Sequence, residues 1–335
     1  MKWPLKAPPP QDMRWLAVED ANAVAACRSA ALAMAARLQF PSARADKLGL
    51  AVTEAASNLH KHARQGSMLL CVNRDADAPG IELVTIDTGP GVRDVGAAMR
   101  DGHSTAGTLG IGLGAIRRLA DFSDLFSMPG HGTALIARFW PEQGPPGTRC
   151  AGLIRPIAGE TECGDAFCAV QADDTMTAVL CDGLGHGPLA AAASAQALAA
   201  VLDHPAGEPA ALLERVHRRM SGTRGGAVGI VQVTAGVAKF AGLGNVAGSI
   251  LSGGSRKSML SVPGIAGYQA RTIRQFNYEV PAGAAIILHS DGLSSRWTVD
   301  AVPGVQARDP LLIAAVLLAE AGIHRDDASV LVLKP

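Results

Sequence analysis

The stretch Cys181-Asp182-Gly183-Leu184-Gly185-His186-Gly187 separates an apolar run from an alanine-rich run. Residues 176–181 are typical of a buried β-strand, and residues 188–202 predict a helix that starts just after the turn. An aspartate followed by glycine at a strand end is most often only a turn. In this chain the arrangement recurs, so the turn alone does not explain it.

Four acidic residues of the second half stand at the ends of predicted strands: Asp165, Asp182, Asp291 and Asp326. A fold that brings these strand ends to one edge of a sheet sandwich would gather four carboxylates. Mg²⁺ and Mn²⁺ prefer oxygen ligands and keep some of their waters. Several carboxylates together with one backbone carbonyl therefore predict a site for two divalent metals.

The second half is rich in predicted strands. Two predicted helices, residues 188–202 and 209–220, lie among them. This order favours a β-sandwich flanked by helices. The predicted strands are residues 151–157, 167–171, 176–181, 228–234, 237–241, 285–289 and 329–333.

A boundary divides the chain near its middle. Residues 141–149 read P-E-Q-G-P-P-G-T-R, which can neither continue a helix nor pair in a central strand. A length of 335 residues with 48% hydrophobic content is enough for two cores. We therefore predict an α+β protein of two domains. The expected divisions are an N-terminal tail at 1–12, a first domain at 13–140, a linker at 141–149 and a second domain at 150–335.

The first domain is predicted to be a small α/β sandwich. Its first two helices should cover residues 21–39 and about 42–63, with Pro41 between them and Ser42 as the cap of the second. A third helix is expected over about residues 113–121. The predicted strands are residues 67–72, 81–87, 124–127 and 133–139.

The second of these helices carries Glu54, Asn58 and His62 on one face, because the three residues are four apart. Taken alone, this face is as readily a solvated stripe on an amphipathic helix. Two glycine-rich segments follow it, Asp87-Thr88-Gly89-Pro90-Gly91 and then residues 107–113, G-T-L-G-I-G-L, which open a helix. Glycines let the backbone approach phosphate closely, and a helix N-terminus offers free N–H donors. This order of elements predicts a nucleotide site.

These motifs, together with G-H-G-T-A from Gly130, resemble the histidine-kinase-like ATPases of the GHKL or Bergerat class. Within that class, the run D-G-H-S-T-A-G-T-L-G-I-G-L from Asp101 is most similar to the anti-sigma-factor serine kinases and the switch-protein kinase of stress-response partner switching. The resemblance covers about residues 13–140. The chain has no Walker-type G-x-x-x-x-G-K-[ST] motif.

The resemblance implies a role for each matching residue. Asn58 would ligate the Mg²⁺ that bridges the ATP phosphates, Glu54 would be the catalytic base or orient water, and Asp87 would accept a hydrogen bond from the adenine amino group. The remaining residues implied to bind ATP are Gly89, Gly91, Thr105, Gly107, Thr108, Leu109, Gly110, Ile111, Gly112, Leu113 and Thr133.

Residues 150–335, through the run D-G-L-G-H-G-P-L-A-A from Asp182, resemble the bacterial branch of the metal-dependent type-2C protein phosphatases, including sporulation stage II and stressosome phosphatases. The resemblance implies two Mn²⁺ or Mg²⁺ ions. Asp182 would bridge them, the Gly183 carbonyl would bind one, and Asp291 and Asp326 would bind the other. Asp165 would bind directly or orient metal-bound waters, which makes Asp165 and Asp182 the implied catalytic residues.

Three details of the phosphatase resemblance stay open on the sequence alone. Asp326 and Asp327 compete for one ligand position, with Asp326 preferred. His186 is either a weaker site candidate or a cap of the following helix. The phosphate-binding arginine of many eukaryotic members has no clear counterpart, although Arg155 lies upstream.

Charge and cysteine usage limit the partners. Basic and acidic residues both total 30, and the chain has no strongly basic run, so we expect neither nucleic acid nor membrane as a partner. The six dispersed cysteines and the lack of an apolar signal segment or a long apolar span predict a cytoplasmic protein with reduced thiols.

Together these features predict a partner-switching protein. Its second domain would remove phosphate from phosphoserine or phosphothreonine on a STAS-type antagonist or stressosome-like scaffold. Its first domain would bind ATP and phosphorylate a partner protein. The alternative is an ATP-dependent binding module that sequesters a sigma factor or regulator and controls the phosphatase without kinase activity; a further alternative is an interaction scaffold with two degenerate sites.

Overall fold

The computed structural model describes residues 5–74, 78–98, 112–142, 144–145, 147–270 and 272–335. The chain forms two compact units. The N-terminal unit holds Pro8–Thr148, and the C-terminal unit combines Met1–Ala7 with Arg149–Pro335. The chain thus passes between the units twice, once within the segment expected to be a linker and once within the segment expected to be a tail.

The N-terminal unit is built on an antiparallel sheet, in which the described residues form strands in the order β2-β3-β4-β6-β5. β4 therefore lies at the centre, and its last residue, Asp87, reaches the end of the sheet next to Thr133 of β6. The strands are β2 (Met13–Ala17), β3 (Ser67–Asn73), β4 (Gly80–Asp87), β5 (Phe122–Met128) and β6 (Gly132–Phe139).

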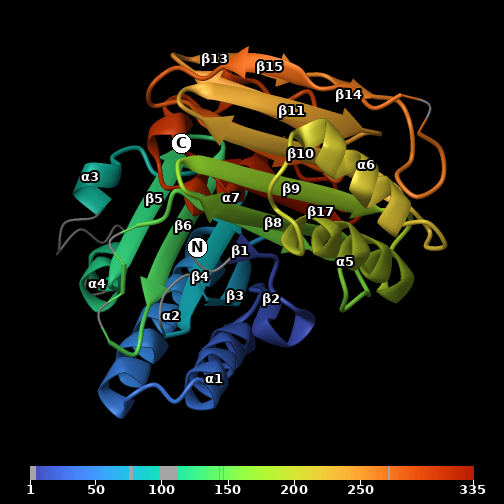
Figure 1. The fold of residues 1–335 in the computed structure, drawn as a ribbon. Helices are drawn as coiled ribbons and strands as arrows, with labels where there is room; N and C mark the ends of the chain where they lie inside the picture. The colour runs from blue at the N-terminus through green and yellow to red at the C-terminus, as the bar shows by residue number, and fades with distance from the viewer. Residues whose placement is uncertain (1–4, 75–77, 99–111, 143, 146, 271) are drawn as a thin grey trace. The chain divides into compact units, whose positions relative to one another are not determined.

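Helices cover one side of this sheet (Figure 1). Asp20 caps α1, because its side chain accepts a hydrogen bond from the Ala23 amide at 2.8 Å. Ser42 does not cap α2 as expected; it is the first helical residue, and Pro41 takes the cap position without a side-chain bond. The helical elements are η1 (Pro10–Asp12), α1 (Ala21–Arg37), α2 (Ser42–His62), α3 (Val95–Ala98) and α4 (Gly112–Leu119).

The C-terminal unit contains two sheets, which confirms the predicted β-rich architecture. In the described residues the first runs β1-β8-β9-β10-β11-β14, with β15 also paired to β11, and the second runs β13-β12-β16-β17-β7. The first sheet comprises β1 (Leu5–Lys6), β8 (Asp165–Ala172), β9 (Thr175–Gly183), β10 (Gly226–Thr234), β11 (Val237–Leu243), β14 (Ser261–Val262) and β15 (Phe276–Glu279). The second comprises β7 (Cys150–Arg155), β12 (Ala247–Ser252), β13 (Ser255–Met259), β16 (Ala285–His289) and β17 (Ala328–Leu333).

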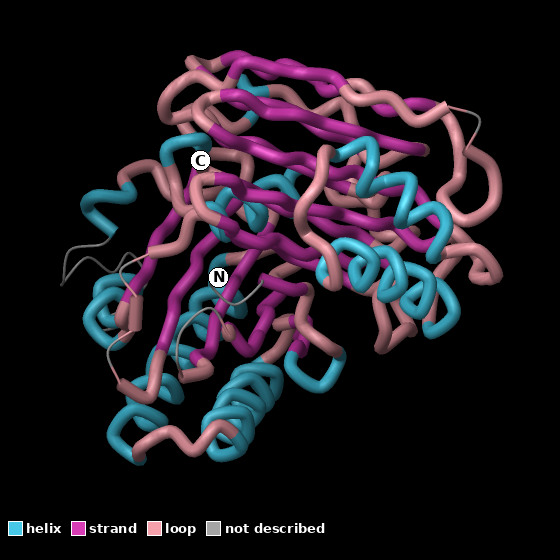
Figure 2. Tube along the Cα trace, viewed as in Figure 1, coloured by secondary structure: helices cyan, strands magenta, loops and turns pink. Residues whose placement is uncertain are grey.

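Helices flank these sheets (Figure 2). α5 (Pro188–Leu202) and α6 (Pro209–Arg219) lie side by side over β8 to β11 (Figure 1). α7 (Pro310–Ala321), which the sequence analysis did not predict as a helix, packs on β7 and β17 and is buried over most of its length. Because α7 is apolar on all sides, its sequence lacks the 3.6-residue period of apolar and polar residues by which an amphipathic helix is recognised. Short 3₁₀ turns precede it at η2 (Val299–Ala301) and η3 (Val305–Ala307).

The first described residues do not form a free tail. β1 pairs antiparallel with β8, placing Leu5 opposite Ala169 and Lys6 opposite Cys168. The Ala7 amide adds a hydrogen bond to the Phe167 carbonyl at 2.8 Å. Two residues are too few to carry a strand pattern, so only the partner strand makes this element recognisable.

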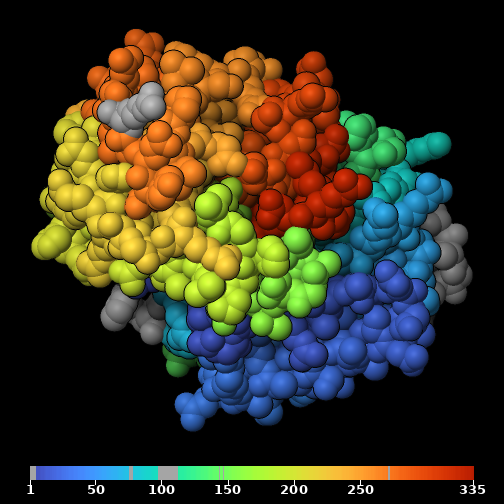
Figure 3. All heavy atoms as spheres, turned by 90° about the vertical axis from the view of Figure 1, so that its right-hand side faces the viewer, coloured from blue at the N-terminus to red at the C-terminus, as the bar shows by residue number. Residues whose placement is uncertain are grey.

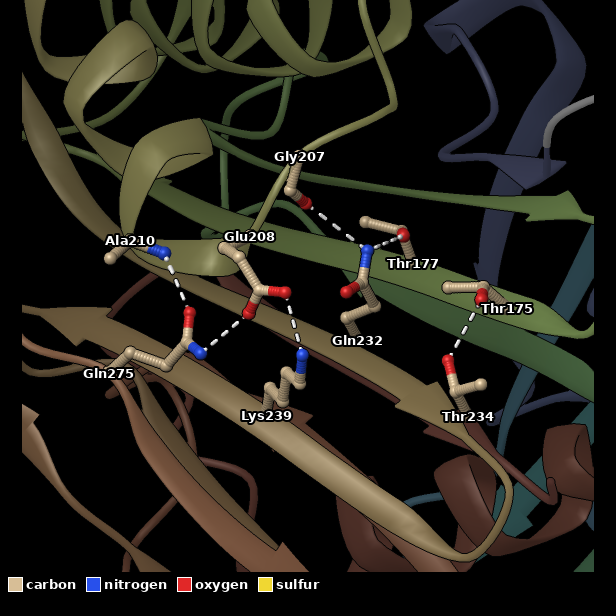
Figure 4. Close-up of polar contacts among 9 residues, drawn as sticks. All are labelled: Thr175, Thr177, Gly207, Glu208, Ala210, Gln232, Thr234, Lys239 and Gln275. Carbon is tan, nitrogen blue, oxygen red and sulfur yellow. Dashed lines mark hydrogen bonds and ion pairs between the residues drawn. The ribbon is translucent and has the colours of Figure 1, made fainter.

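A polar network joins the start of α6 to the solvent side of the first sheet (Figure 4). Glu208 accepts hydrogen bonds from Lys239 at 2.6 Å and Gln275 at 2.8 Å, and the Gln275 side chain also accepts from the Ala210 amide. Gln232 continues the network to Thr177 and the Gly207 carbonyl. These exposed contacts orient the α5–α6 connection.

Within the described residues, helices that combine the length and the apolar character needed to cross a bilayer are absent.

Candidate functional site

The four predicted acidic residues of the C-terminal unit lie together. Asp165 and Asp182 are directly opposite each other in the β8–β9 pair. Asp291 follows β16, and Asp326 precedes β17 in the other sheet. The charges of Asp165, Asp291 and Asp326 all act on Asp182, so strand ends from both sheets meet at one edge.

Crowding of like charges perturbs these carboxyls. Burial, reinforced by Asp165, Asp291 and Asp326, raises the pKa of Asp182 to about 9. Burial also raises the pKa of Asp165 to about 7, although the hydroxyls of Ser290 and Ser329 oppose the shift. Asp182 also shares a hydrogen bond with Asp291. Burial and the neighbouring like charges thus favour the protonated forms of these carboxyls.

The donor set suits hard divalent cations. Among the described residues, the Asp165 Oδ2 atom is buried without a hydrogen-bond partner, an expensive state for a carboxylate oxygen. In the same described part of the chain, no group of three or more His, Cys, Asp or Glu side chains already stands at coordinating distance. The carboxylates are instead paired with one another, so cation binding requires small side-chain shifts and loss of protons.

Gly183 ends β9 in a space that admits no side chain. A Cβ atom on Gly183 would lie 2.4 Å from the Ala190 carbonyl oxygen and 2.8 Å from the Ser194 hydroxyl. The Gly183 amide donates to the Gly164 carbonyl at 3.2 Å. The backbone after Asp182 is therefore held close to the start of α5.

The adjacent pair Asp326 and Asp327 points to different partners. Asp326 acts electrostatically on Asp182 and Asp291. The carboxylate of Asp327 instead accepts hydrogen bonds from the amides of Ile157 and Gly164, each at 2.7 Å. Asp326 thus acts on Asp182 and Asp291, whereas the charge of Asp327 acts on Asp165 and its carboxylate is bonded to the backbone.

Two residues left open by the sequence have other roles. His186 does not cap α5, whose cap position is Gly187 without a side-chain bond. Its Nδ1 atom lies 2.8 Å from Glu160 Oε1, and the His186 side chain is 57% exposed. Arg155 donates from Nη2 to the Ile323 carbonyl at 3.1 Å, and burial lowers its pKa. Its guanidinium is thus already engaged with the backbone before Asp326.

Sequence reasoning missed several contributors to the carboxylate cluster. The side-chain amide of Asn245 donates from Nδ2 to Asp291 Oδ2 at 2.5 Å. Ser290 Oγ accepts from the Ser329 amide at 3.0 Å and lies beside Asp165. Asn245 follows Gly244 directly after β11, so the rule that singled out polar residues at strand ends would have found it.

In the N-terminal unit, the predicted nucleotide residues come from three elements. Asn58 and Glu54 occupy the partly exposed face of α2, whose opposite face buries Ala51, Ala55 and Leu59. A Cβ atom on Gly112, the first residue of α4, would be 3.3 Å from both Asn58 side-chain polar atoms. The start of α4 therefore abuts Asn58, with Leu113 packed toward the core.

The end of β4 forms a second part of this region. Asp87 accepts a hydrogen bond from the Gly89 amide at 2.7 Å, and burial raises its pKa against the bonds from Gly89 and Thr133. Gly91 has φ +69°, and a Cβ atom there would lie 1.9 Å from the Met128 carbonyl oxygen. Glycine is therefore required at this turn.

These two parts are adjacent. A Cβ atom on Gly89 would be 3.0 Å from the His62 carbonyl oxygen, so the loop after Asp87 packs on the end of α2. Thr133 lies opposite Asp87 in the β4–β6 pair, and its hydroxyl shares a 2.9 Å hydrogen bond with the hydroxyl of Ser127. The predicted residues Thr105, Gly107, Thr108, Leu109, Gly110 and Ile111 lie outside the described residues.

Comparison with known families matches both units. Residues 17–139 match the histidine kinase-like ATPase domain, and residues 172–335 match the stage II sporulation protein E (SpoIIE) family.

Individual relatives match each unit in turn. The serine/threonine-protein kinase RsbT of Bacillus subtilis (strain 168) is 32% identical over 117 residues, covering 35% of this chain and 88% of RsbT. The phosphoserine phosphatase RsbX of the same strain is 28% identical over 141 residues, covering 41% of this chain and 70% of RsbX. A solved structure described as "The bacterial stressosome: a modular system that has been adapted to control secondary messenger signaling" aligns with a TM-score of 0.50 at 28% identity, covering 55% of this chain and 97% of that one.

Proposed function

This chain belongs to the RsbT family of histidine-kinase-like ATPases and carries a SpoIIE-type, type-2C phosphatase domain, and from that premise we propose that it is a cytoplasmic two-enzyme switch of partner-switching signalling. Its C-terminal unit hydrolyses phosphoserine or phosphothreonine on a STAS-type antagonist or scaffold. Its N-terminal unit binds Mg-ATP and phosphorylates a partner protein. The gathering of Asp165, Asp182, Asp291 and Asp326 at one edge of the sandwich carries the proposal.

The phosphatase assignment rests on charge balance. Four carboxylates crowd together, and two of them have pKa values raised to about 7 and about 9. Divalent cations would replace protons on these carboxyls and relieve the mutual repulsion. The buried Asp165 Oδ2 oxygen would gain a partner. The residues therefore fit a site for two Mn²⁺ or Mg²⁺ ions.

Each residue has a proposed task. Asp182 would bridge the two metals, the Gly183 carbonyl would bind one, Asp291 and Asp326 would hold the other, and Asp165 would bind directly or orient metal-bound waters. When bound, the metals supply a water of lowered pKa and stabilise negative charge on the phosphoryl group.

Neighbouring side chains prepare this set. The side-chain amide of Asn245 holds Oδ2 of Asp291 and so helps to orient this carboxylate. The hydroxyls of Ser290 and Ser329 stabilise the ionised form of Asp165, which is the form that binds metal. Asp182 must give up its proton for metal to bind, so metal affinity should rise with pH.

The nucleotide assignment rests on the meeting of α2, the end of β4 and the start of α4. Asn58 would hold Mg²⁺ at the phosphates, Glu54 would act as base or orient water, and Asp87 would accept from the adenine amino group. The first turn of α4, which begins at Gly112 beside Asn58, offers unpaired amides to phosphate. A nucleotide placed this way would lie between the N-terminus of α4 and the partly buried carboxylate of Asp87.

Two assays on the purified protein test the proposal. Mn²⁺-dependent hydrolysis of p-nitrophenyl phosphate, and of a STAS protein phosphorylated on serine, should be present in the wild-type protein and lost in Asp291→Ala. Labelled ATP should transfer phosphate to the STAS protein in Asp182→Ala, where dephosphorylation cannot erase the label, and Asn58→Ala in that background should stop the transfer.

The outcomes separate the candidate functions. ATP binding without label transfer would favour the alternative, in which the N-terminal unit sequesters a sigma factor or regulator according to its nucleotide state. No metal-dependent phosphate release from either substrate would reject the phosphatase assignment.

A further inference from the structure

A single buried carboxylate closes the loop that leads to Asp165. The 157–164 loop connects β7 to β8. Asp327 Oδ1 accepts a hydrogen bond from the Ile157 amide and Asp327 Oδ2 accepts one from the Gly164 amide, each at 2.7 Å. The two amides are the two ends of the loop. The Asp327 residue is 3% exposed; its bond to Gly164 is buried and its bond to Ile157 is partly buried.

The second of these bonds fixes the residue just before Asp165. The Gly164 carbonyl, on the other side of the same residue, accepts from the Ser194 hydroxyl at 2.5 Å and from the Gly183 amide at 3.2 Å. A Cβ atom on Gly164 would lie 2.8 Å from Asp327 Oδ2, which shows how closely the carboxylate approaches the backbone. Gly164 is therefore held from both sides, and Asp327 is the only charged group among these contacts.

Asp327 also touches the other segments that carry the carboxylate cluster. Its backbone amide donates to the side chain of Asp326 at 2.9 Å. A Cβ atom on Gly292 would lie 1.9 Å from the Asp327 carbonyl oxygen, so the turn after Asp291 packs directly on this residue. The lime-green segment near residue 160 and the red segment near the C-terminus lie beside each other on the surface (Figure 3).

We propose that Asp327 is a positioning residue for metal binding, which acts through the Gly164 amide on Asp165 and through its own backbone on Asp326 and the Asp291 turn. The inference rests on the proposed phosphatase function. Each carboxylate oxygen of Asp327 accepts a hydrogen bond from a backbone amide, so the proposal gives Asp327 the role of holding the backbone and not that of a ligand. Groups that orient metal ligands commonly change metal affinity by about 10- to 100-fold when removed.

Two substitutions disturb the same hydrogen bond from opposite sides. Asp327→Asn keeps the size of the side chain but replaces one carboxylate oxygen by an NH₂ group. An NH₂ group cannot accept a hydrogen bond, so one of the two backbone amides loses its acceptor. Gly164→Ala keeps Asp327 but adds a Cβ atom 2.8 Å from both Asp327 Oδ2 and the Ala190 Cβ atom, which should disturb the hydrogen bond from the backbone side. Asp309→Ala is the matched control, because Asp309 also accepts from a backbone amide, that of Leu311 at 2.9 Å, at the start of α7.

The experiment measures Mn²⁺ binding by calorimetry on the full-length protein, alongside p-nitrophenyl phosphate hydrolysis as a function of Mn²⁺ and thermal unfolding in chelator. We expect Asp327→Asn and Gly164→Ala to raise the Mn²⁺ dissociation constant by about tenfold or more. Turnover at saturating Mn²⁺ should stay within about threefold of wild type, because the ligands themselves remain. Asp309→Ala should lower the unfolding temperature without changing the Mn²⁺ dissociation constant.

An unchanged Mn²⁺ dissociation constant in either folded variant would overturn the proposal. Loss of folded structure in both variants would also overturn it, since Asp327 would then serve the fold as a whole. Failure of the proposed function would look different. In that case the wild-type protein would bind Mn²⁺ without hydrolysing p-nitrophenyl phosphate. The ratio of the Mn²⁺ dissociation constants of the variant and the wild type would still test the role of Asp327.

Discussion

The two candidate sites of this chain are proposed to handle phosphate with opposite chemistry. In the N-terminal unit, Gly91 and Gly112 lie in the two segments of the proposed nucleotide site, and one partly buried carboxyl, Asp87, has a raised pKa. In the C-terminal unit, four carboxylates crowd one edge, and burial together with their mutual repulsion raises the pKa values of Asp165 and Asp182. The proposed N-terminal site would bind the phosphate anions directly. The proposed C-terminal site would bind cations, and these cations would attract the phosphate anion.

The difference also concerns distance along the chain. Asp87, Gly89 and Gly91, which are proposed to shape the nucleotide site, lie within five consecutive residues, so a sequence motif contains all three. Asp165, Asp182, Asp291 and Asp326 come together only because two sheets meet. Substitutions should therefore separate the two sites cleanly if each depends on its own chemistry.

The largest separation is expected from Asp182→Ala. Removing the proposed bridging carboxylate should reduce Mn²⁺-dependent hydrolysis of p-nitrophenyl phosphate by roughly 10³-fold or more, because several kcal/mol of charge stabilisation depend on the metals. Binding of a fluorescent ATP analogue should be unchanged. A matching loss of nucleotide affinity would show that the sites are not independent.

The converse change is Asp87→Ala. Loss of the proposed acceptor for the adenine amino group should weaken ATP binding by roughly 10- to 100-fold, in line with hydrogen bonds to charged groups. Calorimetric titration with ATP measures this effect. Nucleotide-free phosphatase activity serves as the control, and a fall in that activity would contradict the contrast between the sites.

A smaller effect is expected at Asn245. Asn245→Ala removes the bond to Asp291 Oδ2 and should raise the half-saturating Mn²⁺ concentration by about tenfold. Asn277→Ala, on the exposed side of β15, is a matched control and should leave the Mn²⁺ dependence as it is. If the two variants had the same half-saturating Mn²⁺ concentration, Asn245 would have no role in metal binding.

The smallest effect is a shift of unfolding temperature with pH. The pKa values of Asp165 and Asp182 are higher in the folded protein than the ordinary value of 3.8, so the folded state binds more protons than the unfolded state. Their contribution to stability is complete below pH 3.8 and is lost as pH rises through about 7 and about 9. Metal-free protein should therefore melt at lower temperature at pH 9 than at pH 6.

Thermal scans in chelator and in Mn²⁺ check this dependence. Saturating Mn²⁺ should flatten it, because the cations stabilise the ionised carboxylates. Asp182→Asn should remove most of the slope in chelator. A slope that persists unchanged in Asp182→Asn would assign the pH dependence to groups outside the carboxylate cluster.

Much of this molecule could be predicted from local patterns. Apolar runs followed by Asp-Gly pairs located β9, which contains Asp182 near its end, and β16, which Asp291 follows. The spacing of Glu54 and Asn58 located one face of α2. Local patterns failed where packing decides. The α7 residues are apolar on all faces and lack a period, and β1 has only two residues.

At the carboxylate cluster, too, local sequence patterns could not identify the role of every residue. The sequence could not separate Asp326 from Asp327, because the distinction depends on amides of the 157–164 loop, far away in the chain. Ser290 and Asn245 likewise gain their roles only through Asp165 and Asp291. A strand-end aspartate is visible in a sequence, whereas its hydrogen-bond partners follow from tertiary structure.

The strand β1 has a consequence for biosynthesis. Leu5 and Lys6 are translated before the N-terminal unit, whereas their partner β8 is translated only after it. The sheet that carries Asp165 is therefore complete only once residues on both sides of the N-terminal unit have been synthesised. A phosphatase unit expressed from residue 149 onward would expose the backbone edge of β8 around Cys168, a surface prone to pairing with other chains.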